Sequence, residues 1–295
     1  MPHLILVDKP EGITSFSAVA AIKRKLGIKR VGHTGTLDPM ATGVLPILTG
    51  RASRLSSLML DADKGYTATL RLGTVTDTLD ITGEVLKTNA VNVSDEEFLS
   101  VLEKFKGEIY QVPPMFSALK KDGVRLYDLA REGKEVEREK RLVEIKKLEF
   151  IKRLNETDFI IDVTCSKGTY IRSLAESIGE ALGCGACLIA LRRTFAAGFK
   201  IEDCIPLEDI KNMEDNSFLL SAEICVSHFR EINVSIPQAT RFLNGGELDF
   251  NRIRNVDNIK DGEKFRVKSQ GEFLGIGYAD LEKNALKIGC IIKED

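Results

Sequence analysis

Alternating apolar and polar residues mark several stretches of the chain as β-strands. In residues 66–72 every second residue from Tyr66 to Leu72 is apolar, and polar side chains fill the other face. Five further strands are predicted, at about 142–151, 158–165, 264–268, 272–278 and 285–292. The last three lie where short β-like runs alternate with Gly and Asn turns, so the texture of the chain changes after about residue 230.

Apolar residues at helical spacing predict three helices, over residues 15–26, 94–106 and about 169–182. Ser15 is the predicted N-cap of the first helix. Ser94 and Glu97 form a capping box at the start of the second. Helices mixed with strands, followed by a β-rich end, place the chain in the α+β class.

Two stretches lack a regular pattern. Residues 32–50 are rich in Gly and Thr and are too irregular for one regular element. Residues 117–141 are highly charged and weakly periodic, which indicates a protruding, mobile excursion.

The chain has 295 residues, of which 43% are apolar and 29% are charged. This length suits one large domain or two domains, and the composition excludes a disordered chain. We expect a catalytic domain over residues 1–230 and a small β-rich domain over residues 231–295.

Several functional classes are excluded by what the sequence lacks. Six irregularly spaced cysteines do not make a secreted disulfide scaffold. Cys184 and Cys187 form a single CxxC pair, and three histidines add few ligands, so no metal site is expected. Phosphate-binding and dinucleotide-binding loops are missing, so no cofactor is expected. Without a signal-peptide pattern or a run of ~20 apolar residues, we expect a reduced, cytoplasmic protein.

The net charge of −2 conceals an uneven distribution of charge. Residues 1–60 hold eight basic and three acidic residues, whereas residues 61–113 hold five basic and ten acidic residues. The first segment either presents a basic face to phosphate groups or forms an ordinary solvated helix surface around residues 23–25.

Asp38 is the most distinctive candidate for chemistry. It is the one acid in GHTGTLDPMATGVLPILTG (residues 32–50), and Pro39 follows it. The residue before a proline is driven out of the helical region, so Asp38 sits on a sharp turn that displays its carboxylate. A carboxylate among apolar groups needs a cationic partner. The alternative is a simple Asp-Pro turn without function.

Two distant residues are candidates to act with Asp38. Arg172 stands where a strand gives way to a helix, and its guanidinium can hold a carboxylate and keep it ionised, or it is a surface arginine. Tyr66 is either a core tyrosine or a ring that stacks on a base. Asp80 begins an Asp-Ile-Thr-Gly sequence that resembles half of an aspartic protease site, but no second half is present.

Seven stretches resemble, in order, the bacterial tRNA pseudouridine-55 synthases of the TruB type. Together they span most of residues 4–200, which makes a chance match negligible. The stretches are VDKPEGITS (7–15), GHTGTLDPMATGVLPI (32–47), KGYTATLRLG (64–73), TDTLDITGEV (76–85), PPMFSALKKDGVRLYDLAREG (113–133), SKGTYIRSLAESIGEALG (166–183) and LRRT (191–194).

This resemblance implies roles for eight side chains. Asp38 matches the essential catalytic aspartate, Arg172 matches the arginine that pairs with it, and Tyr66 matches the tyrosine that stacks on the target uracil. His33 matches the histidine that fills the space left by flipped-out loop nucleotides. The other matches are Tyr170 and Leu191, which line the uridine pocket, and Lys9 and Pro10, which support the site from behind.

The resemblance also implies a fold and a partner. The fold is a large mixed, mainly antiparallel sheet crossed by an RNA-binding cleft. An insertion at about 114–141 clamps the RNA, and residues 231–295 form an RNA-binding domain of the PUA type. The expected partner is the T-arm of tRNA, and we expect a monomer without a protein partner, a membrane or a metal.

The implied reaction isomerises uridine 55 in the T-loop of tRNA. The N1–C1′ bond breaks, the base rotates in place, and C5 bonds to C1′. Asp38 acts as the nucleophile, and attack at C6, attack at C1′ and a glycal-like intermediate all stay open. Two other functions are a non-catalytic RNA-binding or RNA-folding module and a synthase for a different RNA. The presence of Asp38, Tyr66 and Arg172 favours an enzyme.

Overall fold

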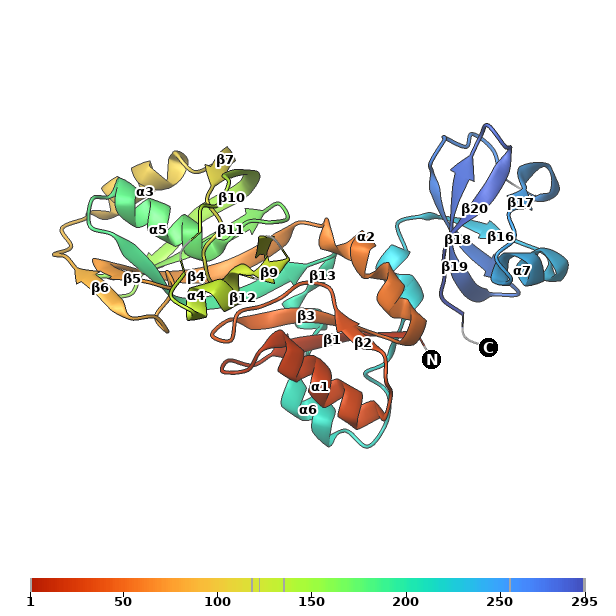
Figure 1. Ribbon diagram of the computed structural model, residues 1–295, viewed down its shortest axis with the longest axis horizontal. Helices are drawn as coiled ribbons and strands as arrows, with labels where there is room; N and C mark the ends of the chain where they lie inside the picture. The colour runs from red at the N-terminus through yellow and green to blue at the C-terminus, as the bar shows by residue number, and fades with distance from the viewer. Residues whose placement is uncertain (1, 118, 122, 135, 255, 294–295) are drawn as a thin grey trace.

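The structure, a computed structural model, describes residues 2–117, 119–121, 123–134, 136–254 and 256–293. Its main feature is an eleven-stranded sheet that runs through the N-terminal three quarters of the chain, and a five-stranded sheet lies at the C-terminal end (Figure 1). The strands of the large sheet are β1 (His3–Lys9), β2 (Val31–His33), β3 (Thr42–Thr49), β4 (Lys64–Leu72), β7 (Gly107–Gln111), β10 (Arg141–Arg153), β11 (Asp158–Cys165), β12 (Ala186–Ala196), β13 (Phe199–Lys200), β14 (Ile205–Pro206) and β15 (Leu220–Ser221).

The main path of this sheet is β14-β1-β3-β12-β4-β11-β10-β7. The β14–β1 and β3–β12 pairs are parallel, and the other pairs along the path are antiparallel. The prediction of a mixed, mainly antiparallel sheet is therefore confirmed. Residues 32–50, which looked irregular, contain β2, a loop and β3 rather than one element.

Strand β12 joins the two halves of the sheet. It pairs with β4 along most of its length but with β3 through two residues, Arg192 opposite Thr42 and Arg193 opposite Gly43. The loop that carries Asp38 ends at this junction, because β3 begins at Thr42. The junction thus brings the loop against the strand that carries Tyr66.

The first predicted helix is present as α1 (Ser15–Leu26). The predicted N-cap was wrong by one residue. Thr14 has extended backbone angles, and its hydroxyl accepts the N–H of Ser17 at 3.0 Å. Ser15 is instead buried inside the first turn, where it is free to bond a neighbouring loop. The helix α1 shares an apolar cluster with β1, β3 and α6 (Leu207–Asn212).

Two helices cover the other half of the sheet, α3 (Asp95–Glu103) and α5 (Ile171–Ala181). The predicted capping box at Ser94 is confirmed, although the helix ends three residues earlier than expected. The Phe98 ring stacks on Phe159 of β11 with centroids 4.5 Å apart, which fixes α3 on the sheet. The helix α5 begins at Ile171, so Arg172 stands in its first turn.

The charged segment predicted as an excursion contains regular structure. It has a hairpin of β8 (Lys120–Lys121) and β9 (Val124–Arg125), followed by α4 (Leu126–Arg131). Residues 118, 122 and 135 of this segment lie outside the described residues. A second hairpin, β5 (Thr74–Thr76) with β6 (Val85–Thr88), projects from the end of β4 (Figure 1).

The C-terminal sheet has the strand order β16-β18-β19-β20-β17, and the predicted β-rich texture is present there. Its apolar face packs on a helix whose first turn holds a proline and a capping box. The elements are β16 (Arg230–Asn233), α7 (Ile236–Leu243), β17 (Leu248–Asp249), η4 (Phe250–Arg252), β18 (Lys264–Ser269), β19 (Glu272–Asp280) and β20 (Ala285–Ile291).

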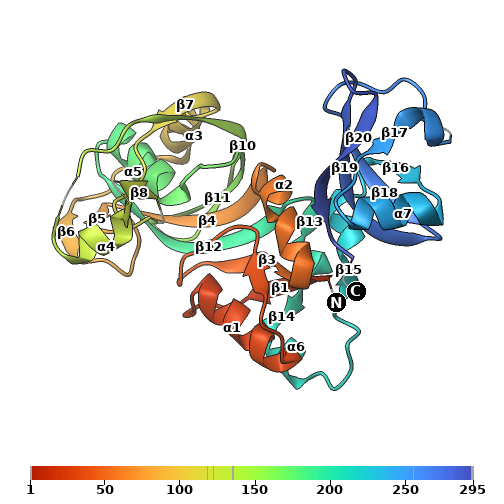
Figure 2. The same ribbon diagram turned by 45° about the vertical axis from the view of Figure 1, so that its right-hand side comes forward.

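This sheet is attached to the rest of the molecule through α2 (Ser56–Leu60) and the 3-10 turn before it, η1 (Gly50–Leu55) (Figure 2). Arg51 donates to the carbonyl of Lys293 at 2.7 Å, and Arg54 donates to the carbonyl of Ile291 at 3.0 Å. Apolar side chains of both parts form one cluster. The remaining short elements are η2 (Ile201–Asp203) and η3 (Ala222–Val226).

Candidate active site

The loop between β2 and β3 presents Asp38 on a tight turn. The N–H of Ala41 donates to the Asp38 carbonyl at 3.0 Å, which closes the turn around Pro39. The Asp38 side chain is 34% exposed and lines a cavity, so its carboxylate is reached from the cavity but is largely shielded from bulk water. The Asp-Pro sequence therefore produces the displayed carboxylate that its backbone restriction predicts.

Side chains and backbone groups of β1 and α1 hold this loop from one side. The Ser15 hydroxyl donates to the Leu37 carbonyl at 3.1 Å and accepts the Leu37 N–H at 2.8 Å. Lys9 is fully buried, and its ammonium donates to the carbonyls of Ile13 and Pro39 at 2.8 and 3.4 Å. These contacts leave the loop little freedom on the side away from the cavity.

Arg172 forms an ion pair with Asp38. Its Nε lies 2.9 Å from Oδ2 of Asp38, and its side chain is only 5% exposed. The guanidinium also donates to the carbonyl of Thr78 at 3.1 Å and to the carbonyl of Phe116 at 2.8 Å. Arg172 thus joins the Asp38 loop, the β5–β6 hairpin and the start of the 114–141 insertion at one point.

Asp80 is part of this site, although the sequence alone made it look like a chance match to another enzyme class. Its Oδ2 lies 3.6 Å from Nη1 of Arg172. Its other oxygen accepts from the Thr78 hydroxyl at 2.9 Å and from the Thr82 N–H at 3.0 Å. No spacing or motif in the chain signals this contact, because the β5–β6 hairpin brings Asp80 to Arg172 only in the folded state.

Burial controls the electrostatics of the Asp38 carboxyl group. Desolvation raises the pKa of Asp38 above its ordinary value, the Arg172 charge and hydrogen bond oppose this rise, and the Asp80 charge adds to it. Arg172 therefore offsets the cost of burying Asp38 only in part. Behind the loop, desolvation lowers the pKa of Lys9 to about 8.

Asp38 and Arg172 line a cavity of about 330 Å³. Tyr66, Tyr170 and Leu191 also line it, so five of the eight side chains singled out by the resemblance meet there. Tyr66 shares its strand face with buried leucines as predicted, and desolvation raises its pKa to about 12. A neutral phenol therefore faces the cavity at physiological pH.

Tyr170 is held at the rim by a side chain that the sequence did not single out. Gln111 of β7 is buried, accepts the Tyr170 N–H at 3.1 Å and donates to the Tyr170 carbonyl at 3.3 Å. This pair links the edge strand to the residue before α5. It fixes the direction in which the Tyr170 side chain leaves the backbone.

His33, Lys9 and Pro10 are not among the side chains that line the cavity. His33 lies at the end of β2, where its Nδ1 accepts the Gly35 N–H at 3.2 Å. Burial, with a smaller effect of Arg193, lowers the pKa of His33, so the ring is neutral near pH 7. Lys9 contacts the loop through the Pro39 carbonyl, and Pro10 is exposed.

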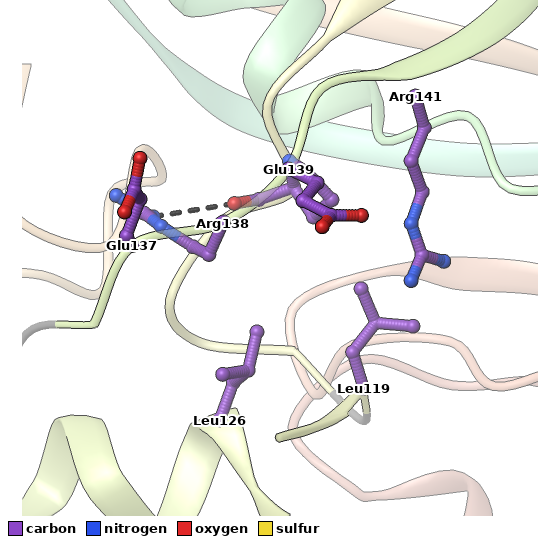
Figure 3. Close-up of a pocket in the computed structure, with 7 residues that line it drawn as sticks. Leu119, Leu126, Glu137, Arg138, Glu139 and Arg141 are labelled. Carbon is purple, nitrogen blue, oxygen red and sulfur yellow. Dashed lines mark hydrogen bonds between the residues drawn. The ribbon is translucent and has the colours of Figure 1, made fainter. Parts of the chain in front are cut away.

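A second cavity of about 210 Å³ lies beside the insertion. Figure 3 shows Glu139 and Arg141 extending toward the space above Leu119. Arg138 anchors this segment by donating to the Pro113 carbonyl at 3.2 Å. Burial raises the pKa of Tyr170 at the first cavity, and the charge of Arg141 opposes this rise.

In the described part of the chain, no three His, Cys, Asp or Glu side chains are grouped as metal ligands would be. Cys184 and Cys187 are both buried. None of the described helices is long and apolar enough to cross a membrane.

Solved structures with the same architecture are known. The chain superposes on the structure of an H/ACA RNP bound to a substrate RNA containing 2′-deoxyuridine with a TM-score of 0.74 and 25% identity, over 99% of this chain and 85% of that one. It superposes on a Cbf5-Nop10-Gar1 complex with a TM-score of 0.72 and 28% identity, over 99% and 84%. The chain therefore has the pseudouridine synthase fold.

Sequence comparisons identify the family. Residues 23–171 match the N-terminal domain of the TruB family of pseudouridylate synthases, and residues 172–224 match the tRNA pseudouridylate synthase B C-terminal domain. The tRNA pseudouridine synthase B of Clostridium tetani is 44% identical over 96% of this chain and 97% of its own length. That of Chromobacterium violaceum is 43% identical over 94% and 90%. The chain belongs to the TruB family and is an isomerase that forms pseudouridine in tRNA.

Proposed function

We propose that this enzyme converts uridine 55 in the T-loop of tRNA to pseudouridine, with Asp38 as the nucleophile. The observation that carries the proposal is the Asp38 carboxylate, held 2.9 Å from Arg172 in a cavity of about 330 Å³ whose lining combines aromatic and apolar side chains with polar and charged ones. A cavity of this size suits a single nucleoside, since small-molecule sites span about 300–1,000 Å³.

The uridine must leave the stacked loop to reach this cavity. Extrusion of a nucleotide costs a few kcal/mol, and stacking on an aromatic ring such as Tyr66 returns about 1–3 kcal/mol per base. Tyr170 and Leu191 complete the walls around the base. In this proposal His33 fills the space that the extruded nucleotide leaves in the RNA.

Asp38 then drives the exchange of bonds. The N1–C1′ bond breaks, the uracil rotates in the closed cavity, the C5–C1′ bond forms, and the C5 proton is lost while N1 gains one. Asp38 attacks C6 of the base or C1′ of the sugar, or removes a sugar proton to give a glycal-like intermediate. Arg172 aims the carboxylate and favours its ionised form. Lys9 and Pro10 support the Asp38 loop from behind and limit its movement.

The regions outside the cavity bind the rest of the RNA. We assign the insertion at 114–141 to clamping the T-arm, because Phe116 at its start contacts Arg172 through its carbonyl. The domain at 231–295 is assigned to RNA binding of the PUA type. The chain acts on tRNA as a monomer in the cytoplasm.

The test uses an unmodified tRNA transcript and an isolated T-arm hairpin. Pseudouridine is mapped along each RNA after incubation with the wild-type chain and with Asp38→Asn. We expect modification at position 55 by the wild type and RNA binding without turnover by the variant. Turnover by Asp38→Asn refutes the role of Asp38. Binding without turnover by the wild type supports an RNA-folding module, and modification at another site or in another RNA refutes position 55.

A further inference from the structure

Arg193 is a second buried arginine at the cavity, besides Arg172, and the proposed reaction does not use it. Its side chain is 1% exposed and is among the largest fully buried side chains of the described residues. It stands on β12 at the junction of the two half-sheets, opposite Gly43 of β3 and Tyr66 of β4. Part of it lines the same cavity as Asp38.

The Arg193 guanidinium bonds backbone carbonyls on both sides of Asp38. Its Nε donates to the carbonyl of Val44, a residue after the loop, at 2.7 Å. Its two terminal nitrogens donate to the carbonyls of two residues before Asp38, Thr36 at 3.3 Å and Gly35 at 3.2 Å. One rigid, planar group therefore spans the two ends of the loop and fixes their separation.

The backbone of Arg193 comes unusually close to the end of the loop. Gly43 has a φ of +105°, and a Cβ atom there would lie 2.2 Å from the Arg193 carbonyl oxygen. A side chain at position 43 is excluded by this contact. The glycine lets β12 approach β3 closely enough for the Arg193 side chain to reach back under the loop.

Tyr66 stands directly opposite Arg193 on the neighbouring strand β4, is buried, and lines the same cavity. A guanidinium is only a donor, and the three loop carbonyls take up three of its five N–H groups. Arg193 therefore contacts the Asp38 loop while its strand pairs with the strand that carries Tyr66.

The free-energy cost of burying the Arg193 guanidinium indicates that this side chain has a role beyond packing. In the part of the chain that the structure describes, Arg193 forms no ion pair with a carboxylate, unlike Arg172. A buried cation is expensive to desolvate, and apolar side chains of similar volume are often as stable or more stable. Carbonyl dipoles offset part of the cost. A methionine would fill the same space. Only an arginine has a planar group with enough N–H donors to bond carbonyls at both ends of the loop.

We propose that Arg193 is a positioning residue that sets the geometry of the Asp38 loop relative to the strand that carries Tyr66. The proposal rests on the proposed function and deepens it. Arg172 holds the carboxylate from the cavity side, and Arg193 holds the backbone that carries it. The Asp38 loop is thereby fixed against β12, the strand that pairs with the Tyr66 strand.

The test compares Arg193→Lys with Arg192→Lys. Arg192 is the next residue on β12, is partly exposed, and pairs with Asp8 at 2.7 Å outside the cavity, so it is a matched control. Lysine keeps the charge at position 193 but is a single point donor that cannot span three carbonyls. Single-turnover rates are measured at saturating enzyme and at a temperature where circular dichroism shows both variants to be folded. RNA affinity is measured in the Asp38→Asn background.

We expect Arg193→Lys to lower the single-turnover rate about 100-fold, because a small misplacement of reacting groups has effects of this size. RNA affinity should stay within about 3-fold, and Arg192→Lys should retain the wild-type rate. A purely structural role leaves the rate of the folded protein unchanged.

Two results overturn the inference. One is a rate for folded Arg193→Lys within about 3-fold of the wild type. The other is a loss of RNA affinity that accounts for the whole defect. Inactivity of the wild-type chain on tRNA refutes the proposed function instead, so the two failures are distinguishable.

Discussion

Replacing Arg172 by methionine tests the Asp38 ion pair directly. The substitution keeps most of the volume of the side chain but removes the bond to Asp38 at 2.9 Å and the two carbonyl bonds to Thr78 and Phe116. A hydrogen bond to a charged group contributes about 1.5–3 kcal/mol. Each 1.36 kcal/mol of barrier is a factor of ten in rate, so the lost Asp38 contact alone predicts a rate reduction of about 10- to 150-fold.

The pH dependence of Arg172→Met provides a second readout. Arg172 lowers the pKa of Asp38 against the larger effect of burial. Without the guanidinium the pKa of Asp38 rises further, so the carboxylate is protonated at a higher pH. The acidic limb of the single-turnover pH–rate profile should therefore move to higher pH. RNA affinity should change little.

The matched control is Arg71→Met, which removes an ion pair on the same sheet but away from the cavity. Arg71 donates to both oxygens of Asp158 at 2.8 Å. This variant should lose stability while keeping the wild-type rate and pH profile. If Arg172→Met keeps its rate, or if its acidic limb stays in place, the reasoning about the Asp38 pair is refuted.

Three further predictions concern other parts of the fold. Asp80→Asn should lower the single-turnover rate about 10-fold and move the acidic limb to lower pH, since the Asp80 charge raises the pKa of Asp38; an unchanged profile contradicts this. Asp158 has a pKa of about 2, below its ordinary value, so its pairing with Arg71 stabilises the fold above about pH 4 by about 1–2 kcal/mol. That stability is lost as the pH falls toward 2, so the unfolding free energies of Asp158→Asn and the wild type should converge there in denaturant titrations. Phe98→Ala should cost about 3–5 kcal/mol in the same assay, and a loss below 1 kcal/mol would contradict the role of the aromatic stack.

Local sequence signals predicted the elements that depend on neighbouring residues. The alternation in 158–165 matches β11, and the capping box at Ser94 begins α3 as expected. Periodicity and capping act over a few residues, so they can be read without a fold. The N-cap of α1 was misplaced because Thr14 and Ser15 are both good caps and only the folded loop decides between them.

Long-range pairing explains what local patterns did not predict. Strand β12 is stabilised by partners more than 100 residues away, and its sequence carries no clear alternation. The same holds for Asp80 and Gln111, which reach the site through a hairpin and an edge strand. Asp38 could be picked out because an acid before proline in an apolar loop is unusual in itself. Arg172 could be offered as its partner only beside the alternative of a surface arginine, and the fold decides between the two.

The attachment of the C-terminal sheet has a consequence for synthesis on the ribosome. Leu48 of β3 lies in the same apolar cluster as Ile276 and Ile292, which are translated more than 200 residues later. At about 5–20 residues per second, the first strands wait about 10–45 s before this face can be covered. Nascent chains therefore expose this apolar surface throughout that interval. A ribosome-associated chaperone has a defined surface to cover until Ile292 has been translated.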